Sequence, residues 1–242
     1  MYGITSTQWR QIYHILEEHR DHIRWVKLFG SRARGDYRET SDIDLAIGGD
    51  CDLRGLLQGA FEQSKLPYTF DIVLYDDLAH GKLRDRIDTE GRLLFCIDEG
   101  RRIMTVERIH LKWEDYHRAL ERLDIALEKD ADTDDMYLDA TIQRFEFCFE
   151  LAWKLIKAVL EYEGIEANSP RGCIREGWKQ GLISDAEAWL EMMEKRNLSS
   201  HTYDENVARE IYHDVKERYA ALLESFDQTM NDWQSDTERK NT

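Results

Sequence analysis

A glycine-serine turn followed closely by a pair of aspartates constrains the fold of this chain more than any other feature. Residues 25–29 form a short apolar run that is typical of a strand, and Gly30-Ser31 follows it directly. A Gly-Ser turn between a strand and a helix presents free backbone N–H groups, which bind phosphate. Asp42 and Asp44 stand two apart in an extended stretch, so both side chains point to one face of a sheet.

A third carboxylate completes this set. Asp71 interrupts the apolar pattern of a strand that we expect over residues 69–75. Carboxylates side by side repel each other unless a divalent cation lies between them, and Mg²⁺ favours one or two carboxylates together with substrate phosphates. Asp71 either reaches the same metal site or takes the proton from an attacking hydroxyl group. The pattern therefore predicts the transfer of a nucleotide.

The same residues carry a family resemblance. Residues 30–35 and 41–45 match the motif GSxARG…SDxDL at every defining position. This motif resembles the nucleotidyltransferase superfamily of DNA polymerase β, and specifically its minimal type, called MNT. The resemblance covers roughly residues 24–97 and implies an enzyme that uses ATP and Mg²⁺.

The resemblance also implies roles for single residues. Gly30 and Ser31 would hold the triphosphate, and the carboxylates would bind Mg²⁺, namely Asp42, Asp44 and Asp71. Arg32 is grouped with the nucleotide-binding residues, although the sequence leaves open whether it binds phosphate or holds the loop.

Periodicity divides the chain into two different halves. Residues 1–100 alternate between strands and amphipathic helices, which predicts a small mixed α/β sheet domain with flanking helices. The strands are expected near 25–29, 43–48, 69–75 and 92–97, and the helices near 7–22, 52–64 and 77–90. Residues 101–235 lack a strand signal and predict an all-α bundle, with a polar tail over 236–242. Its helices are expected near 104–129, 136–163, 171–180, 185–197 and 203–233.

A second constellation lies between the last two expected helices. Arg196, His201 and Tyr203 stand at a loop-to-helix junction, where side chains are accessible. A histidine can act as general acid or base near neutral pH, and an arginine can stabilise a pentacovalent phosphate; neither needs a metal. The bland alternative is that the three residues only cap and pack a helix junction.

These residues match the HEPN motif RxxxxHxY. With residues 143–153, 169–171 and 189–190, they resemble the helical proteins known as nucleotidyltransferase substrate-binding subunits, over roughly residues 105–225. The resemblance implies a ribonuclease in which Arg196 and His201 of two subunits meet across a homodimer. It also implies that the MNT domain transfers AMP onto the motif tyrosine, here Tyr203. The resemblance therefore implies a protein of toxin–antitoxin type, although the MNT and HEPN halves are fused in this chain, which departs from the usual arrangement in two separate proteins.

Net charge and composition limit the kinds of partner that the chain can bind. The chain has a net charge of −16, and residues 99–242 hold 20 Lys and Arg against 32 Asp and Glu. An acidic half does not attract nucleic acid by its overall field, so any RNA contact there must be local, and no DNA partner is expected. We expect a cytoplasmic protein without a membrane partner, because apolar stretches are short and Cys51, Cys96, Cys148 and Cys173 are widely spaced.

Two alternatives to this interpretation remain open. One is a small-molecule nucleotidyltransferase whose helical half binds the acceptor. The other is a helical half that serves only for dimerisation, without ribonuclease activity.

Overall fold

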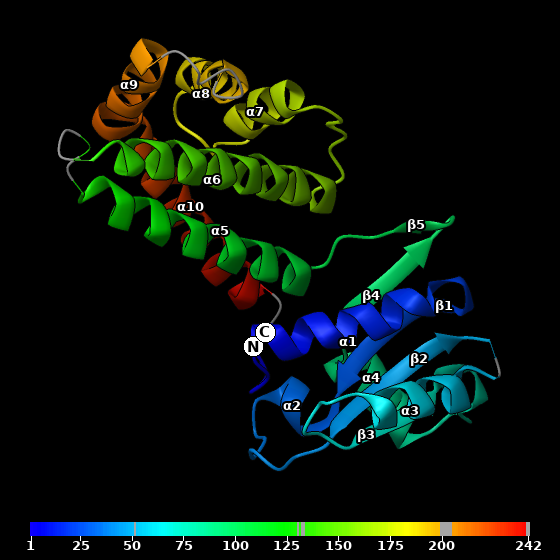
Figure 1. The fold of residues 1–242 in the computed structure, drawn as a ribbon. Coiled ribbons are helices and arrows are strands. Elements are labelled where there is room, and N and C mark those ends of the chain that lie inside the picture. Colours follow the sequence, from blue (N-terminus) through cyan, green and yellow to red (C-terminus); the bar gives the residue numbers. More distant parts are fainter. Residues whose placement is uncertain (51, 130, 132–133, 199–204, 241–242) are drawn as a thin grey trace. The chain divides into compact units, whose positions relative to one another are not determined.

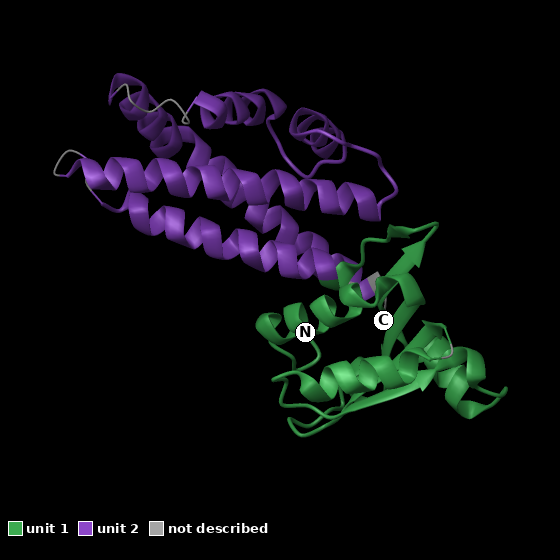
Figure 2. Cartoon of the chain, turned by 45° about the vertical axis from the view of Figure 1, so that its right-hand side comes forward, with its two compact units in different colours: residues 1–107 green, residues 108–242 purple. Residues whose placement is uncertain are grey.

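The computed structural model describes residues 1–242 except 51, 130, 132–133, 199–204 and 241–242. The chain divides into two compact units, Met1–Glu107 and Arg108–Thr242 (Figure 2). This division falls a few residues after the predicted one between residues 100 and 101. No helix within the described ranges is long and apolar enough to cross a membrane.

A mixed sheet forms the centre of the first unit (Figure 1). Its strand order is β3-β2-β1-β4-β5, and the only parallel pair among the described residues is β2 with β3. The predicted α/β class is confirmed, and β5 is an addition that the sequence pattern did not indicate. The strands are β1 (Ile23–Phe29), β2 (Ile43–Gly49), β3 (Phe70–Leu74), β4 (Arg92–Asp98) and β5 (Arg101–Arg102).

The helices of this unit cover the sheet and connect its strands. They are α1 (Ser6–Glu18), α2 (Gly30–Arg34), α3 (Leu53–Gln63) and α4 (Lys82–Glu90). Ile87 of α4 packs with Phe29 and Ala46 on one face of the sheet. The predicted helix over 77–90 was too long at its start, because α4 begins only at Lys82, after a separate 3₁₀ turn at residues 75–77.

The second unit is built from helices alone in its described part. They are α5 (Val106–Leu127), α6 (Asp135–Tyr162), α7 (Pro170–Lys179), α8 (Ala186–Leu198), α9 (Glu205–Asp214) and α10 (Ala220–Lys240). The expected single helix over 203–233 is instead α9, a π-helical turn at Val215–Tyr219 and α10. The expected polar tail over 236–242 is helical as far as Lys240, because α10 continues into it.

Aromatic side chains fill the core of the bundle. Phe149 lies 6.4 Å from Phe145 and 6.2 Å from Trp189 between ring centroids, and Trp189 lies 5.5 Å from Phe226. Phe145 and Phe149, which are one turn apart on α6, are both buried. Their spacing therefore reflects the interior of the bundle rather than a surface for a partner.

Candidate functional site

The Gly-Ser turn lies where β1 ends and α2 begins. Gly30 has φ +73°, a left-handed conformation that glycine adopts without strain. A Cβ atom at this position would lie 2.1 Å from Asp44 Oδ2, so a larger residue would displace that carboxylate. Ser31 is half-buried in the first turn of α2. Glycine is thus required here both by the backbone and by the neighbouring aspartate.

Strand pairing brings the predicted carboxylates together. Asp44 of β2 pairs in register with Phe29 of β1 on one side and with Asp71 of β3 on the other. Asp42 precedes β2 by one residue and is exposed. We call Asp42, Asp44 and Asp71 the carboxylate site.

The charges of Asp42 and Asp71 act on Asp44, the third member of the carboxylate site. Burial raises the pKa of Asp44 above its ordinary value, and the negative charges of Asp71 and Asp42 raise it further. Repulsion of this kind is relieved when a cation binds between the carboxylates. The donor set is made of hard oxygen ligands, which suits Mg²⁺.

The carboxylate site fits a metal ion that takes some of its ligands from the protein and the others from a bound substrate. Within the described ranges, no three His, Cys, Asp or Glu side chains could hold a metal ion by themselves. Mg²⁺ commonly completes its coordination with phosphate oxygens and water. A metal at this site would therefore be held by Asp42 and Asp44 together with a bound nucleotide.

Arg32 has a different position from the one its sequence grouping suggested. Its side chain is fully buried, and its guanidinium donates to the carbonyl oxygens of Tyr2 at 2.9 Å and Ser41 at 2.7 Å. It also donates to the carbonyls of Glu39 and Asp42, and it stacks 4.8 Å from the ring of Tyr68. The sequence left open whether Arg32 binds phosphate or holds the loop. These contacts support the loop-holding role, because they fix the loop that leads to Asp42.

Two arginines that the sequence did not single out with a definite role lie near the carboxylates. Arg34 and Arg86 both lower the pKa of Asp44, against the larger effects that raise it. Arg34 pairs with Asp36 at 3.2 Å and Glu90 at 3.3 Å, and Arg86 lies 3.8 Å from Glu90. Arg86 comes from α4, so only the packing of that helix against the sheet could reveal it.

In the second unit, Arg196 is held by an ion pair. Its guanidinium lies 2.8 Å from the Glu150 carboxylate of α6, which also pairs with Lys154 at 3.2 Å. Arg196 is near the end of α8, and 38% of its side chain is exposed. His201 and Tyr203, the other members of the motif, lie outside the described residues.

Comparison with known proteins places both halves. The family described as "Nucleotidyltransferase substrate binding protein like" matches residues 111–232, half of the chain. The chain belongs to this family. Its first half matches the family "Polymerase beta, Nucleotidyltransferase" over residues 10–100. This member of the substrate-binding family therefore carries a nucleotidyltransferase domain in the same chain, as the two motifs indicated.

Two curated relatives of this family member cover parts of it. "Probable ribonuclease HepT" of Haemophilus influenzae is 34% identical over 83 residues, which are 32% of this chain and 57% of that protein. "Putative protein adenylyltransferase MJ0604" of Methanocaldococcus jannaschii is 57% identical over 35 residues, or 14% of this chain and 35% of that protein. The chain thus spans less than two thirds of the length of each.

Two solved structures also resemble this family member. A Thermus thermophilus protein is 38% identical with a TM-score of 0.44, covering 48% of this chain and 98% of its own. A Haemophilus influenzae protein, described as having the fold of a substrate binding domain of a nucleotidyltransferase, is 21% identical with a TM-score of 0.40. It covers 52% of this chain and 99% of its own.

Proposed function

We propose that the first unit transfers AMP from ATP to Tyr203 of the helical half, in the same chain or in a second copy. The convergence of Asp42, Asp44 and Asp71 beside Gly30 is the observation that carries this proposal. A bond forms between the tyrosyl oxygen and the α-phosphorus, and the bond from that phosphorus to the bridging oxygen breaks. Pyrophosphate leaves with the electron pair of that broken bond.

The tyrosyl proton must be removed during this step, because the pKa of tyrosine is ordinarily near 10. A carboxylate near the attacking oxygen can take it, and Asp71, the register partner of Asp44, is the candidate for this role. Asp42 and Asp44 would hold Mg²⁺, which neutralises charge on the triphosphate. Arg34 and Arg86 add positive charge on the same side of the sheet.

The helical half would cleave RNA without a metal. His201 would take a proton from the attacking hydroxyl, and Arg196 would stabilise the pentacovalent phosphate. The Glu150 carboxylate at 2.8 Å competes with that phosphate for Arg196. An AMP group on Tyr203 adds bulk and negative charge beside the motif and would exclude RNA. The names of the two curated relatives, a ribonuclease and a protein adenylyltransferase, support this pairing.

Mass spectrometry after incubation with ATP and Mg²⁺ tests the transfer. We expect AMP on Tyr203 of the unaltered protein. Tyr203→Phe should lack that modification while keeping the fold, because only one hydroxyl group is removed. Wild-type protein that shows no linked AMP, while ATP is consumed, would exclude the tyrosine as the acceptor.

A second candidate is a small-molecule nucleotidyltransferase with a helical acceptor-binding domain. The description of the family as substrate binding favours it. In that case the same experiment would leave the protein unmodified and would yield an adenylylated small molecule once the acceptor is supplied.

Self-association through the helical half is also part of the proposal. Phe145 and Phe149 give it no support, because they are buried inside one bundle. It rests on the HEPN resemblance, which places two copies around a two-fold axis. Light scattering at micromolar concentration should find dimers, and a purely monomeric protein would remove the composite ribonuclease site.

A further inference from the structure

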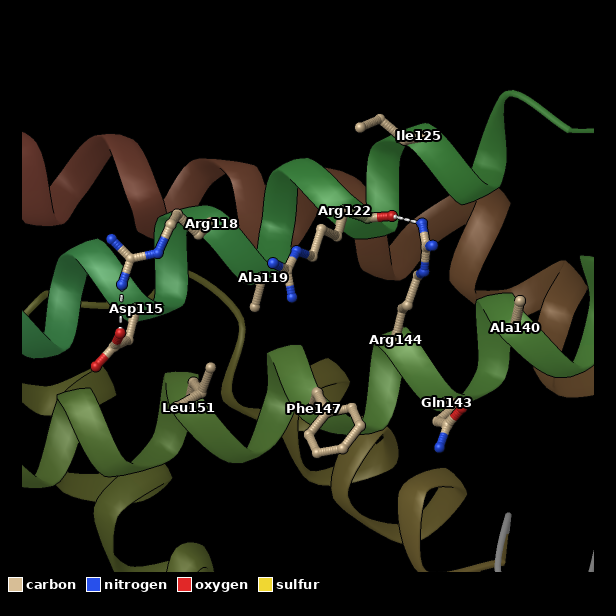
Figure 3. A pocket seen from close by; sticks show the side chains of 10 residues that line it. All are labelled: Asp115, Arg118, Ala119, Arg122, Ile125, Ala140, Gln143, Arg144, Phe147 and Leu151. Atoms are coloured by element: carbon tan, nitrogen blue, oxygen red, sulfur yellow. Dashed lines mark hydrogen bonds and ion pairs between the residues drawn. The ribbon is translucent and has the colours of Figure 1, made fainter.

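A groove of about 770 Å³ runs along the helical unit between α5 and α6. It contains no residue of the carboxylate site, and Figure 3 shows side chains from both helices along it. Its walls combine arginines with apolar side chains. The lining residues that matter here are Arg118, Ala119 and Arg122 of α5, and Arg144, Phe147 and Leu151 of α6.

The charge of the groove is opposite to that of the half in which it lies. Three arginines and one aspartate, Asp115, line it, whereas residues 99–242 have a large excess of Asp and Glu. Asp115 pairs with Arg118 at 2.5 Å, and Arg144 donates to the main-chain carbonyl of Arg122 at 2.5 Å. The guanidinium of Arg122 is exposed and makes no hydrogen bond or ion pair among the described residues.

Phe147 is the aromatic member of the groove. Its side chain is 59% exposed, whereas Phe145 and Phe149 on the same helix are buried. Bundle packing therefore gives no reason for an aromatic residue at this position. An exposed ring in a groove that is also lined by guanidinium groups offers a surface on which a nucleic-acid base can stack while the neighbouring phosphates are neutralised.

The groove also lies close to the motif arginine along α6. Glu150, which pairs with Arg196, stands three residues after Phe147 and one before Leu151. Residues three and four apart on a helix are neighbours on its surface. A strand lying against Phe147 and Leu151 would therefore pass beside the carboxylate that holds Arg196.

We propose that this groove binds single-stranded RNA, with phosphates at Arg118, Arg122 and Arg144 and a base stacked on Phe147. The proposal deepens the ribonuclease part of the proposed function and rests on it for the choice of RNA. It also explains how an acidic domain admits RNA: the overall field repels a polyanion, and the groove accepts it locally.

A second copy of the chain is the competing occupant, because the groove lining includes a second exposed apolar side chain, Ile125, in addition to Phe147. Guanidinium groups line both walls, however, and burying them costs free energy unless each meets a carboxylate. Phosphate oxygens of a nucleic acid can pair with these guanidinium groups while the bound strand stays partly exposed to water. The observations therefore favour the nucleic acid.

The test measures binding of a fluorescently labelled single-stranded RNA by anisotropy over a salt series. The full-length His201→Ala protein is used so that the strand stays intact. Arg122→Gln and Phe147→Ala alter the groove, and both side chains are exposed, so the fold should be kept. Arg175→Gln and Trp178→Ala are matched controls, because these exposed residues lie on α7 away from the groove.

Phe147→Ala should weaken binding by about 5- to 150-fold, the range expected for one stacked base. Arg122→Gln should reduce the slope of log affinity against log salt by about 0.7, the effect of one phosphate contact to a single strand. A residue with a purely structural role would not change that slope selectively. The two control variants should bind RNA as the parent protein does.

Unchanged RNA affinity in both groove variants would overturn the proposal, as would an absence of RNA binding by the parent. Loss of self-association in Phe147→Ala, with RNA binding intact, would assign the groove to a second copy instead. The proposed ribonuclease is tested separately by cleavage in the wild-type protein. Cleavage with unaltered RNA binding in the groove variants refutes the groove alone, and groove-dependent binding without cleavage refutes the ribonuclease alone.

Discussion

The carboxylate site and the Arg196 motif are held in place by different means. Asp44 and Asp71 are register partners on adjacent strands, and Gly30 leaves the space that the Asp44 carboxylate occupies. Arg196, by contrast, is positioned through a side-chain ion pair with Glu150 near the end of its helix. The first arrangement depends on the backbone of the sheet, and the second on a contact that a competing anion can replace.

This difference indicates that the Arg196 motif is easier to regulate than the carboxylate site. A half-exposed ion pair contributes little stability, so exchanging Glu150 for a phosphate at Arg196 costs little. The backbone positions of Asp44 and Asp71 on paired strands, in contrast, cannot shift without disturbing the sheet. We therefore expect the activity of the transferase site to be sensitive to any substitution that shifts its carboxylates. The activity of the proposed ribonuclease site should instead respond to changes of charge near Arg196.

The largest effect should come from Asp42→Asn combined with Asp44→Asn. Loss of the metal ligands should reduce nucleotide transfer by about 10³-fold or more while leaving the fold intact. Transfer of label from α-labelled ATP measures this. Asp77→Asn is the control, because Asp77 is an exposed aspartate outside the carboxylate site. Full transfer by the double variant in the presence of Mg²⁺ would show that other residues carry the metal.

His201→Ala should lower RNA cleavage by about 10²–10⁴-fold, the usual contribution of a general acid or base. Cleavage should persist in EDTA and be clearest when the carboxylate site is disabled and Tyr203 is unmodified. His213→Ala serves as the control, since His213 is an exposed histidine on α9. Cleavage that requires Mg²⁺ or survives His201→Ala would separate the nuclease from this motif. If the protein with a disabled carboxylate site cleaves RNA no faster than wild type, the proposed regulation of the helical half by the first half is wrong.

Arg32→Ala should destabilise the first unit, because the Arg32 side chain is fully buried and donates several hydrogen bonds. It would leave the partly buried carbonyls of Tyr2 and of the loop before β2 without donors, at a cost of about 3 kcal/mol. Such a loss lowers the melting temperature by roughly 6–12 °C in a chain of this size. Arg38→Ala in the same loop, where the side chain is exposed, should change it little. Equal melting temperatures would contradict the loop-holding role.

The smallest effect is expected for Asp44→Asn without Mg²⁺. Burial and like charges raise the pKa of Asp44 in the folded protein, so its ionised form costs folding free energy. That cost is absent well below the ordinary pKa of aspartate, grows as pH rises from that value toward the raised folded pKa, and is complete above the folded pKa. The variant should therefore melt a few degrees higher than wild type at neutral pH, and the gain should vanish at low pH.

Added Mg²⁺ provides the complementary measurement. It should stabilise wild type through the carboxylates and leave Asp44→Asn nearly unchanged, which calorimetry can follow with and without ATP. Identical melting at all pH values would mean that the charges near Asp44 already balance, as Arg34 and Arg86 tend to make them.

Much of the architecture could be predicted because it depends on local patterns. The alternation that predicted strands at 43–48 and 69–75 corresponds to β2 and β3 within one or two residues. The helix over 203–233 was wrong where a π-helical turn interrupts it, because such a turn leaves the helical periodicity of the sequence almost unchanged. The start of α4 was also misplaced, since a turn at residues 75–77 and the residues up to Gly81 precede the helix.

By itself, the sequence determined which residues can do chemistry. A glycine at the end of a strand and two aspartates at a spacing of two indicate their geometry because backbone conformation and strand alternation are local properties. Only the tertiary structure decided what lies opposite them. The register of β2 with β3 sets Asp71 beside Asp44, and burial makes Arg32 a support of the loop. The same packing leaves Phe147 outside the bundle, because contacts between distant segments follow from the whole fold rather than from any local pattern.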